Sequence, residues 1–271
     1  MPRCQRIYLI PTIASAAFCM IAGCQSLLPF EPWKSEAIHL PGNVELHSDF
    51  SIPTKHRFLK ELETCEKRIE NWIEISDSNE TIHLELFEDR DRFAKFVRGS
   101  YPEFDDRRAF FVKTDTRLTV YANWGERVLQ DMRHEMTHAY LHRSYLNIPL
   151  WLDEGLAEFF ETTFDENGRN EIHIVALSKA FREEQWIPNL RRLELIDRPE
   201  MFGQTEYAEA WLWVHFLLTH SEATRELVQR KLNSEEPSEV IVSAELLSLL
   251  PDVQVQLVEH LNALAKSVVN K

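Results

Sequence analysis

The chain has 271 residues, of which 44% are hydrophobic and 11% aromatic, and its formal net charge is −14 at pH 7. This composition is that of a folded protein with a sizeable core and excludes a largely disordered chain. The negative charge would be repelled by nucleic-acid phosphates, so we expect no nucleic-acid partner.

The amino terminus predicts secretion and a lipid anchor. Two arginines precede a mostly apolar run from Ile7 to Ala22, the outline of a secretory signal. The run ends in Ile21-Ala22-Gly23-Cys24, which resembles the lipobox of bacterial lipoproteins. This resemblance implies a signal peptide over residues 1–23, lipidation of Cys24, and an extracytoplasmic protein anchored to a membrane of the cell envelope. An uncleaved signal-anchor is the alternative, although the apolar run is short for a membrane span.

The cysteines restrict the cross-links that the mature chain can form. Cys4 and Cys19 lie within the predicted signal, and Cys24 would carry lipid. Only Cys65 would keep a free thiol, which excludes an intramolecular disulfide and a cysteine-ligated zinc site. Residues 24–42 contain several prolines and little periodicity, and we expect them to be a tether.

Residues 43–124 predict a lobe of strands and helices. Two stretches have the alternating pattern of half-buried strands, two further stretches look like strands joined by a polar turn, and two have the spacing of helices. We expect His56 to cap or flank the first helix and His83 to be exposed on a strand. The expected strands are 44–48, 81–87, 109–112 and 118–122, and the expected helices follow Pro53 and span 89–96.

From Gly125 the chain is predicted to be mainly helical. One helix runs through residue 141, and a second follows Pro149 and spans 150–160. The overall prediction is an α+β fold, with a small mixed sheet and helices at 43–124 and a helical lobe at 125–271. Later in the chain we expect a short strand at 172–175 and helices at 207–219, 223–232, 240–250 and 253–268.

The sequence His134-Glu135-Met136-Thr137-His138 matches the pattern H-E-x-x-H. Positions i and i+4 lie on one face of a helix, so both histidines can bind one zinc ion. Glu135 is rotated by about 100° from His134 and can act on the water that zinc polarises. A solvated helix that carries these residues by chance is the alternative.

A hydrolytic zinc site takes a third protein ligand. His142 lies about 12 Å along the helix axis from the first motif histidine, at about 1.5 Å per residue, which is too far for one ion. The metzincin pattern is excluded because Leu141 and Ser144 stand where it needs glycine and histidine. The remaining source is the next helix, in which Glu154 and Glu158 share one face. An acidic face exposed to solvent is the alternative.

Together the two helices resemble those of the gluzincin metallopeptidases. The likeness is closest to the small peptidase-MA-like group, which follows H-E-x-x-H with W-L-x-E-G-x-A, here Trp151–Ala157, and it is specific over residues 108–162. The resemblance implies a thermolysin-like pair of zinc helices in a single peptidase domain over residues 43–271. It also implies Zn²⁺ as the cofactor, with Glu154 as the third ligand and Glu158 as an acid that orients a ligand histidine.

Gluzincins also use a tyrosine or histidine after the third ligand to stabilise the oxyanion. Tyr207 is the best positional match, and His215 is a weaker candidate. A tyrosine of the protein core is the alternative interpretation of Tyr207.

The sequence therefore predicts a zinc metallopeptidase that hydrolyses peptide bonds in a peptide or protein substrate outside the cytoplasmic membrane. Two alternatives stay open. One is a non-catalytic zinc-binding module that recognises a protein of the cell envelope, which the presence of Glu135 disfavours. The other is a hydrolase of amide bonds in the cell wall, whose zinc chemistry would be the same.

Overall fold

The computed structural model describes residues 36–269, apart from 76–77, 164–165 and 237–238. The predicted signal peptide, Cys24 and most of the predicted tether lie outside these residues. Within the described part of the chain, no helix is both long enough and apolar enough to span a bilayer.

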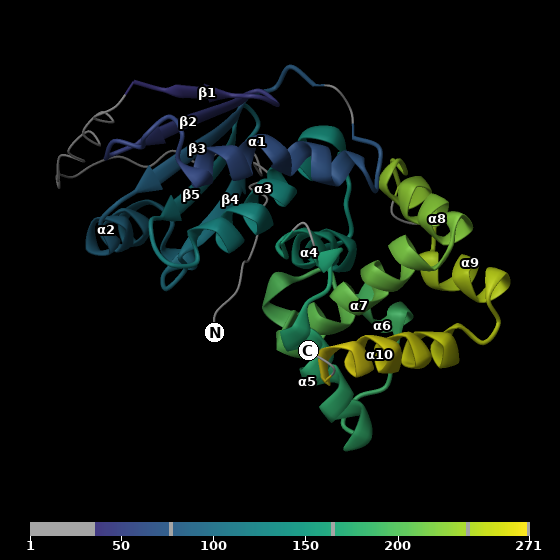
Figure 1. Ribbon diagram of the computed structural model, residues 1–271. Coiled ribbons are helices and arrows are strands. Elements are labelled where there is room, and N and C mark those ends of the chain that lie inside the picture. The colour runs from purple at the N-terminus through teal and green to yellow at the C-terminus, as the bar shows by residue number, and fades with distance from the viewer. Residues whose placement is uncertain (1–35, 76–77, 164–165, 237–238, 270–271) are drawn as a thin grey trace, which may run out of the picture.

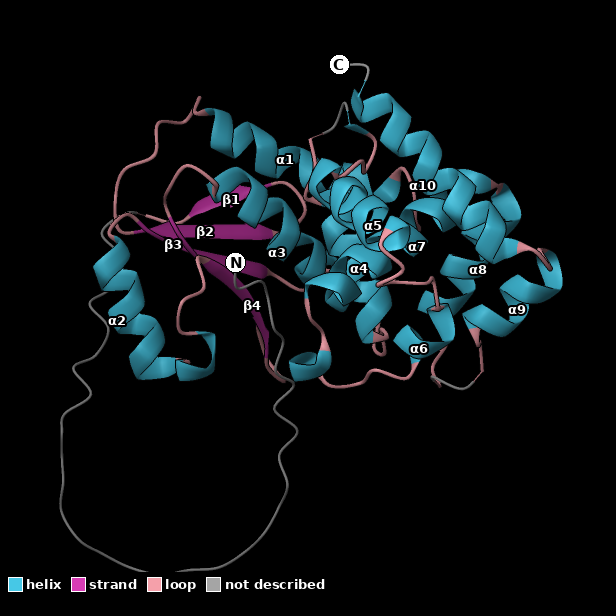
Figure 2. Ribbon diagram, turned by 90° about the horizontal axis from the view of Figure 1, so that it is seen from below, coloured by secondary structure: helices cyan, strands magenta, loops and turns pink. Residues whose placement is uncertain are grey.

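The fold is α+β, which confirms the predicted class. A five-stranded sheet with flanking helices forms one lobe, and helices alone form the other (Figures 1 and 2). The strands are β1 (Ile38–Leu40), β2 (Val44–Ser48), β3 (Ile82–Phe87), β4 (Ala109–Lys113) and β5 (Leu118–Asn123). The α-helices are α1 (Arg57–Glu70), α2 (Arg90–Ser100), α3 (Val128–Ser144), α4 (Leu150–Phe160), α5 (Glu171–Arg182), α6 (Leu190–Glu194), α7 (Gln204–His220), α8 (Glu222–Leu232), α9 (Val242–Leu249) and α10 (Val253–Val269).

The sheet has the strand order β1-β2-β3-β5-β4. The three central strands are parallel to one another, and each edge strand is antiparallel to its neighbour. Parallel neighbours need a crossover connection, and α1 and α2 provide the two crossovers. The sheet is therefore mixed, as predicted.

Alternating side chains give the sheet two faces, each with its own cluster of buried residues. Leu84, Phe111 and Val120 belong to the main core, which also includes residues of α1 and α3. Phe87 and Phe110 belong to a smaller aromatic cluster that includes residues of α2. Because α3 contacts both the sheet and α4, it joins the two lobes.

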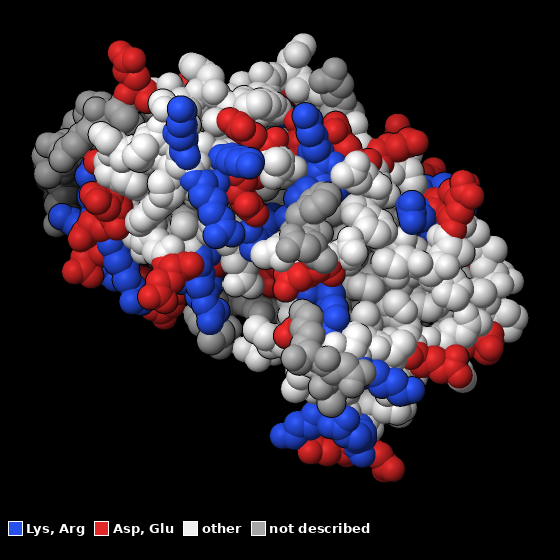
Figure 3. Space-filling view, viewed as in Figure 1, with Lys and Arg blue, Asp and Glu red and all other residues white. Residues whose placement is uncertain are grey.

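The surface carries charged side chains of both signs. Figure 3 shows Lys and Arg side chains gathered over the lobe that holds the sheet, interleaved with Asp and Glu. On this face, and among the described residues, the positive groups therefore form no continuous basic surface.

Most of the predicted helices and strands are present, with ends shifted by a few residues. The first helix begins at Arg57, and the His56 side chain caps it by accepting a hydrogen bond of 3.2 Å from the backbone N–H of Phe58. The capping role expected for His56 is thus confirmed.

Three elements differ from the sequence expectations. The end of the predicted tether forms β1, because Ile38–Leu40 pairs antiparallel with β2. The prediction of a strand at 172–175 is wrong, because these residues lie in the first turns of α5. Asn170 caps that helix, and Ile174 and Leu177 are buried at helical spacing. The short helix α6 was not predicted.

Candidate metal centre

Helix α3 carries the H-E-x-x-H motif through the middle of the protein. Every residue from Met132 to Arg143 is buried, including the polar ones. Polar side chains are costly to bury without partners, so the contacts of this helix determine what it does.

Helix α4 supplies the acids that face the motif. All its residues from Trp151 to Phe160 are buried. A Cβ added to Gly155 would lie 2.6 Å from a Val214 methyl carbon and 2.7 Å from the Ala210 carbonyl oxygen of α7. Glycine at this position therefore lets α4 and α7 pack closely, which fixes where the acid beside it, Glu154, is held.

His134, His138 and Glu154 meet between α3 and α4. The Nε2 atoms of the two histidines each lie 3.6 Å from Glu154 Oε2, and one donor atom from each residue lies within 4.8 Å of the others. Two donors bound tetrahedrally to zinc at about 2.0–2.1 Å are about 3.3 Å apart. The three residues are therefore arranged as a group that could hold a metal ion.

The other nitrogen of each imidazole is bonded to a carboxylate. His134 Nδ1 lies 3.1 Å from Glu161 Oε2, and His138 Nδ1 lies 3.0 Å from Asp153 Oδ1. An ionised carboxylate only accepts hydrogen bonds, so Nδ1–H is the donor and Nε2 is in the form that binds metals. The two rings are nearly perpendicular, at 79°. Their orientation is thus fixed by groups that the sequence interpretation did not assign.

Asp153 also explains the position of His142. The His142 side chain is fully buried, and its Nε2 lies 3.5 Å from the same Asp153 oxygen that bonds His138. His142 is outside the group of three donors, as the axial distance along the helix predicted.

Glu158 lies in a buried group with His134 and Glu161, in which one donor atom of each residue is within 4.8 Å of the others. Its Oε2 lies 2.7 Å from His173 Nε2 and accepts a weaker hydrogen bond from Asn170 Nδ2 at 3.4 Å. Asn170 also donates to Glu161 at 3.1 Å. Glu161 thus bonds His134 directly, and Glu158 belongs to the same network and extends it toward α5.

The region between these helices holds much buried negative charge. Five acids of α3 and α4 or next to them are buried, while Arg133 donates to a backbone carbonyl and pairs with Glu61. Burying carboxylates is costly unless a cation offsets their charge. The donor set and its charge therefore fit a divalent cation. The acids are Glu135, Asp153, Glu154, Glu158 and Glu161.

The acidity of Glu154 reflects the same surroundings. Burial raises the pKa of the Glu154 carboxyl, but the neighbouring His138 and His134 lower it by a larger amount. The pKa of Glu154 therefore lies well below its ordinary value. Glu154 is therefore held as a carboxylate, the form that ligates metals.

Of the two residues predicted to be catalytic, Glu135 lies on α3 and Tyr207 on α7. Glu135 is buried and directly follows His134 on α3. Tyr207 is buried in the first turn of α7, which packs along α4, and its ring meets Phe202 edge-on. His215 lies elsewhere, with Nδ1 2.9 Å from His260 Nε2 of α10.

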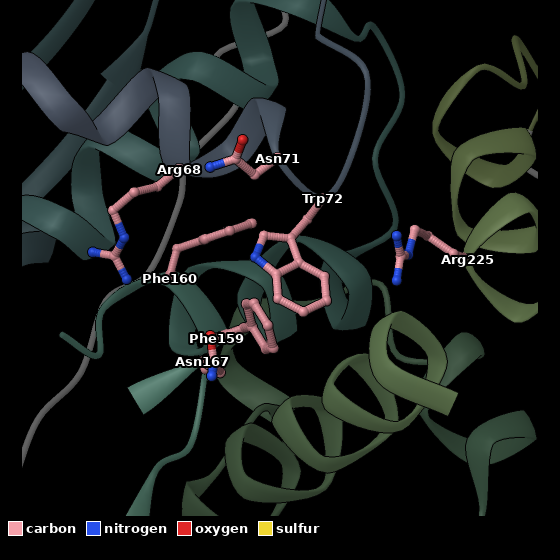
Figure 4. Close-up of a pocket in the computed structure, with 8 residues that line it drawn as sticks. Arg68, Asn71, Trp72, Phe159, Phe160, Asn167 and Arg225 are labelled. Atoms are coloured by element: carbon pink, nitrogen blue, oxygen red, sulfur yellow. The ribbon is translucent and has the colours of Figure 1, made fainter. Parts of the chain in front are cut away.

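A separate pocket of about 280 Å³ opens at the carboxyl end of α4 (Figure 4). Its walls include the aromatic rings of Trp72, Phe159 and Phe160 and the guanidinium groups of Arg68 and Arg225. The candidate metal ligands do not line it, so this pocket is distinct from the metal centre.

Asp153 and Glu161 were missed by the sequence interpretation, although signals for both exist. Asp153 stands inside the W-L-D-E-G motif, and Glu161 follows Glu154 by two helical turns, which places it on the same face of α4. Spacing alone did not separate Glu161 from Glu158.

Residues 129–238 match a protein family described as a protein of unknown function, DUF1570. The match covers less than half of the chain but contains the three candidate ligands and the two carboxylates that bond them. No curated protein matches the chain. The chemistry of the centre therefore has to be inferred from its residues.

Proposed function

We propose that this protein is a zinc-dependent hydrolase of peptide bonds. The observation that carries the proposal is the meeting of His134, His138 and Glu154, with each imidazole oriented by its own carboxylate. Two imidazoles and one carboxylate form a ligand set of catalytic zinc, because they leave a coordination position open.

Zinc held by these residues would act as a Lewis acid and lower the pKa of a water molecule toward neutrality. Glu135 accepts a proton from the attacking water and returns it to the amine that leaves. Asp153 and Glu161 keep the imidazoles in the tautomer and orientation that binding requires. Tyr207 donates a hydrogen bond to the oxygen on which negative charge develops.

The proposal includes the place where the protein acts. The lipobox-like end of the amino-terminal segment supports cleavage before Cys24 and attachment of lipid to that cysteine. The hydrolase would then act on peptides or proteins at the outer side of the cytoplasmic membrane or elsewhere in the cell envelope.

The test combines metal content with hydrolysis. Purified protein is assayed on casein and on wall peptides, with and without a zinc chelator, together with the Glu135→Gln variant. Glu135→Gln is expected to keep about one zinc at this centre and to lose hydrolysis, because the ligands are intact but the base is gone. Glu126→Gln, which changes an exposed acid just before α3, is the matched control and should keep full activity.

Full activity of Glu135→Gln would overturn the mechanism. Zinc binding without hydrolysis of any of these substrates by the unaltered protein would favour the non-catalytic alternative. Cleavage of wall peptides but not casein would favour the alternative of a cell-wall amidase.

A further inference from the structure

A second group of potential ligands lies on the sheet, away from α3 and α4. Glu45 and His47 are two residues apart on β2, so they project from the same face. His83 of β3 is the register partner of Glu45 in the parallel pair. Leu46, between Glu45 and His47, and Leu84, which follows His83, point to the opposite face and are buried in the main core.

The three side chains converge on one point. Glu45 Oε1 lies 3.3 Å from His47 Nε2, and Glu45 Oε2 lies 3.4 Å from His83 Nδ1. One donor atom from each residue lies within 4.8 Å of the other two. These separations are close to the about 3.3 Å expected between donors that share a zinc ion.

His83 is prepared to bind a metal. Its Nδ1 is shielded from solvent and makes no hydrogen bond with the described residues. An imidazole nitrogen that makes no hydrogen bond can coordinate a metal ion when the ring is neutral.

The three side chains are partly exposed, so an ion can reach them from solvent. The side chains of Glu45, His47 and His83 are each between 21% and 26% exposed. The guanidinium of Arg117, just before β5, pairs with Glu85 at 2.6 Å, which offsets its repulsion of a metal. An ion bound here would keep open positions for water or for a ligand from outside.

We propose that Glu45, His47 and His83 form a second metal site, on the outer face of the sheet. Its two nitrogen donors select zinc or a similar divalent transition metal over magnesium and calcium, which prefer oxygen. The metal joins β2 to β3 and stabilises the sheet. This site does not depend on the proposed hydrolase function, because it shares no residue with the centre between α3 and α4.

The experiment measures bound zinc in the purified protein after removal of metal and dialysis against a range of free Zn²⁺. The unaltered protein is expected to bind about two zinc ions, and the His47→Ala/His83→Ala variant about one. His134→Ala/His138→Ala is expected to keep the zinc of the sheet. His39→Ala is the matched control, since His39 is exposed on β1 opposite Glu45 but outside the group, and it should bind as much zinc as the unaltered protein.

The variant Glu45→Gln nearly preserves the shape of the side chain, so it tests the site with little risk of misfolding. Glu45→Gln should weaken zinc binding at the sheet by at least about tenfold, because even partners outside the ligand shell contribute about 10–100-fold. Circular dichroism checks that each variant is folded.

The outcomes separate the two sites. Unchanged zinc binding in both His47→Ala/His83→Ala and Glu45→Gln would overturn the sheet site, as would a single zinc that His134→Ala/His138→Ala removes. A single zinc lost only in His47→Ala/His83→Ala would support the sheet site and contradict the centre between α3 and α4.

Discussion

Asp153 lies directly before the candidate ligand Glu154, and its Oδ1 is 3.0 Å from Nδ1 of His138. One turn of α4 thus presents two acids in succession with different tasks. Glu154 faces the Nε2 atoms of both histidines, and Asp153 holds the far side of one ring. Because the two acids have different contacts, Asp153 and Glu154 cannot exchange places in the motif without losing these contacts.

Replacing Asp153 should weaken zinc binding without removing a ligand. Asp153→Ala is expected to lower zinc affinity by about 10–100-fold, because His138 would lose the bond that orients its ring. Asp153→Asn, whose amide oxygen can still accept a hydrogen bond, should lose less. Competition with a chelator of known affinity measures both, and equal affinity in all three proteins would contradict the role of Asp153.

Glu158 of α4 and Glu161, which directly follows this helix, should differ in their effect on zinc binding. Glu161→Gln is expected to reduce zinc affinity by about tenfold or more, since Glu161 bonds His134 directly. Glu158→Gln should reduce zinc affinity less, because the Glu158 carboxylate bonds His173 at 2.7 Å. The opposite order in the same titration would restore the role that the sequence suggested for Glu158.

Gly155 should be required for packing. Gly155→Ala places a carbon 2.6 Å from Val214 and 2.7 Å from a backbone oxygen, and we expect it to lower the free energy of unfolding by about 1–3 kcal/mol. Gly99→Ala is the matched control in α2, where an added Cβ meets nothing within 4 Å. That change should be neutral or stabilise by up to about 1 kcal/mol. Urea denaturation compares the two, and equal stability of both variants would contradict close packing of α4 on α7.

Acid should destabilise the protein through two histidines of the helical lobe. Burial, with His260 adding to it, lowers the pKa of His215 to about 3. Burial also lowers the pKa of His260 to about 4. In the unfolded chain both would titrate near about 6.5. Between these values the unfolded state binds more protons, so stability falls as pH drops from about 6.5 toward 4.

The variant His215→Gln separates the effect of this histidine on stability from the effect of protonating Asp and Glu side chains at low pH. Its melting temperature should fall less steeply over the same pH window than that of the unaltered protein. Parallel curves for the two proteins would show that the histidine pair does not contribute.

The sequence predicted those parts of the fold and site that follow from local spacing. His134 and His138 share a helical face by their separation alone, and the alternation at 44–48 and 81–87 predicted strands. The residues at 172–175 fit both a strand and a helix, and only the Asn170 cap and the burial of Ile174 decide between them. Four residues are too few for periodicity to settle.

The remaining errors came from packing between distant segments. Glu158 and Glu161 both follow Glu154 on one face, and the rotation of α4 against α3 and α5 decides which acid reaches His134. Strand β1 is only three residues long, so its pairing with β2, more than its own pattern, makes it a strand. Neither effect is visible in a short window of sequence.

The central claim is that His134, His138 and Glu154 bind one zinc ion between α3 and α4. Anomalous diffraction from crystals of the zinc-loaded protein, measured on both sides of the zinc absorption edge, tests it directly. We expect a peak about 2.0–2.2 Å from both Nε2 atoms and from a carboxylate oxygen of Glu154. No peak at this position in fully zinc-loaded crystals, or a peak there bound by His142 in place of Glu154, would contradict it.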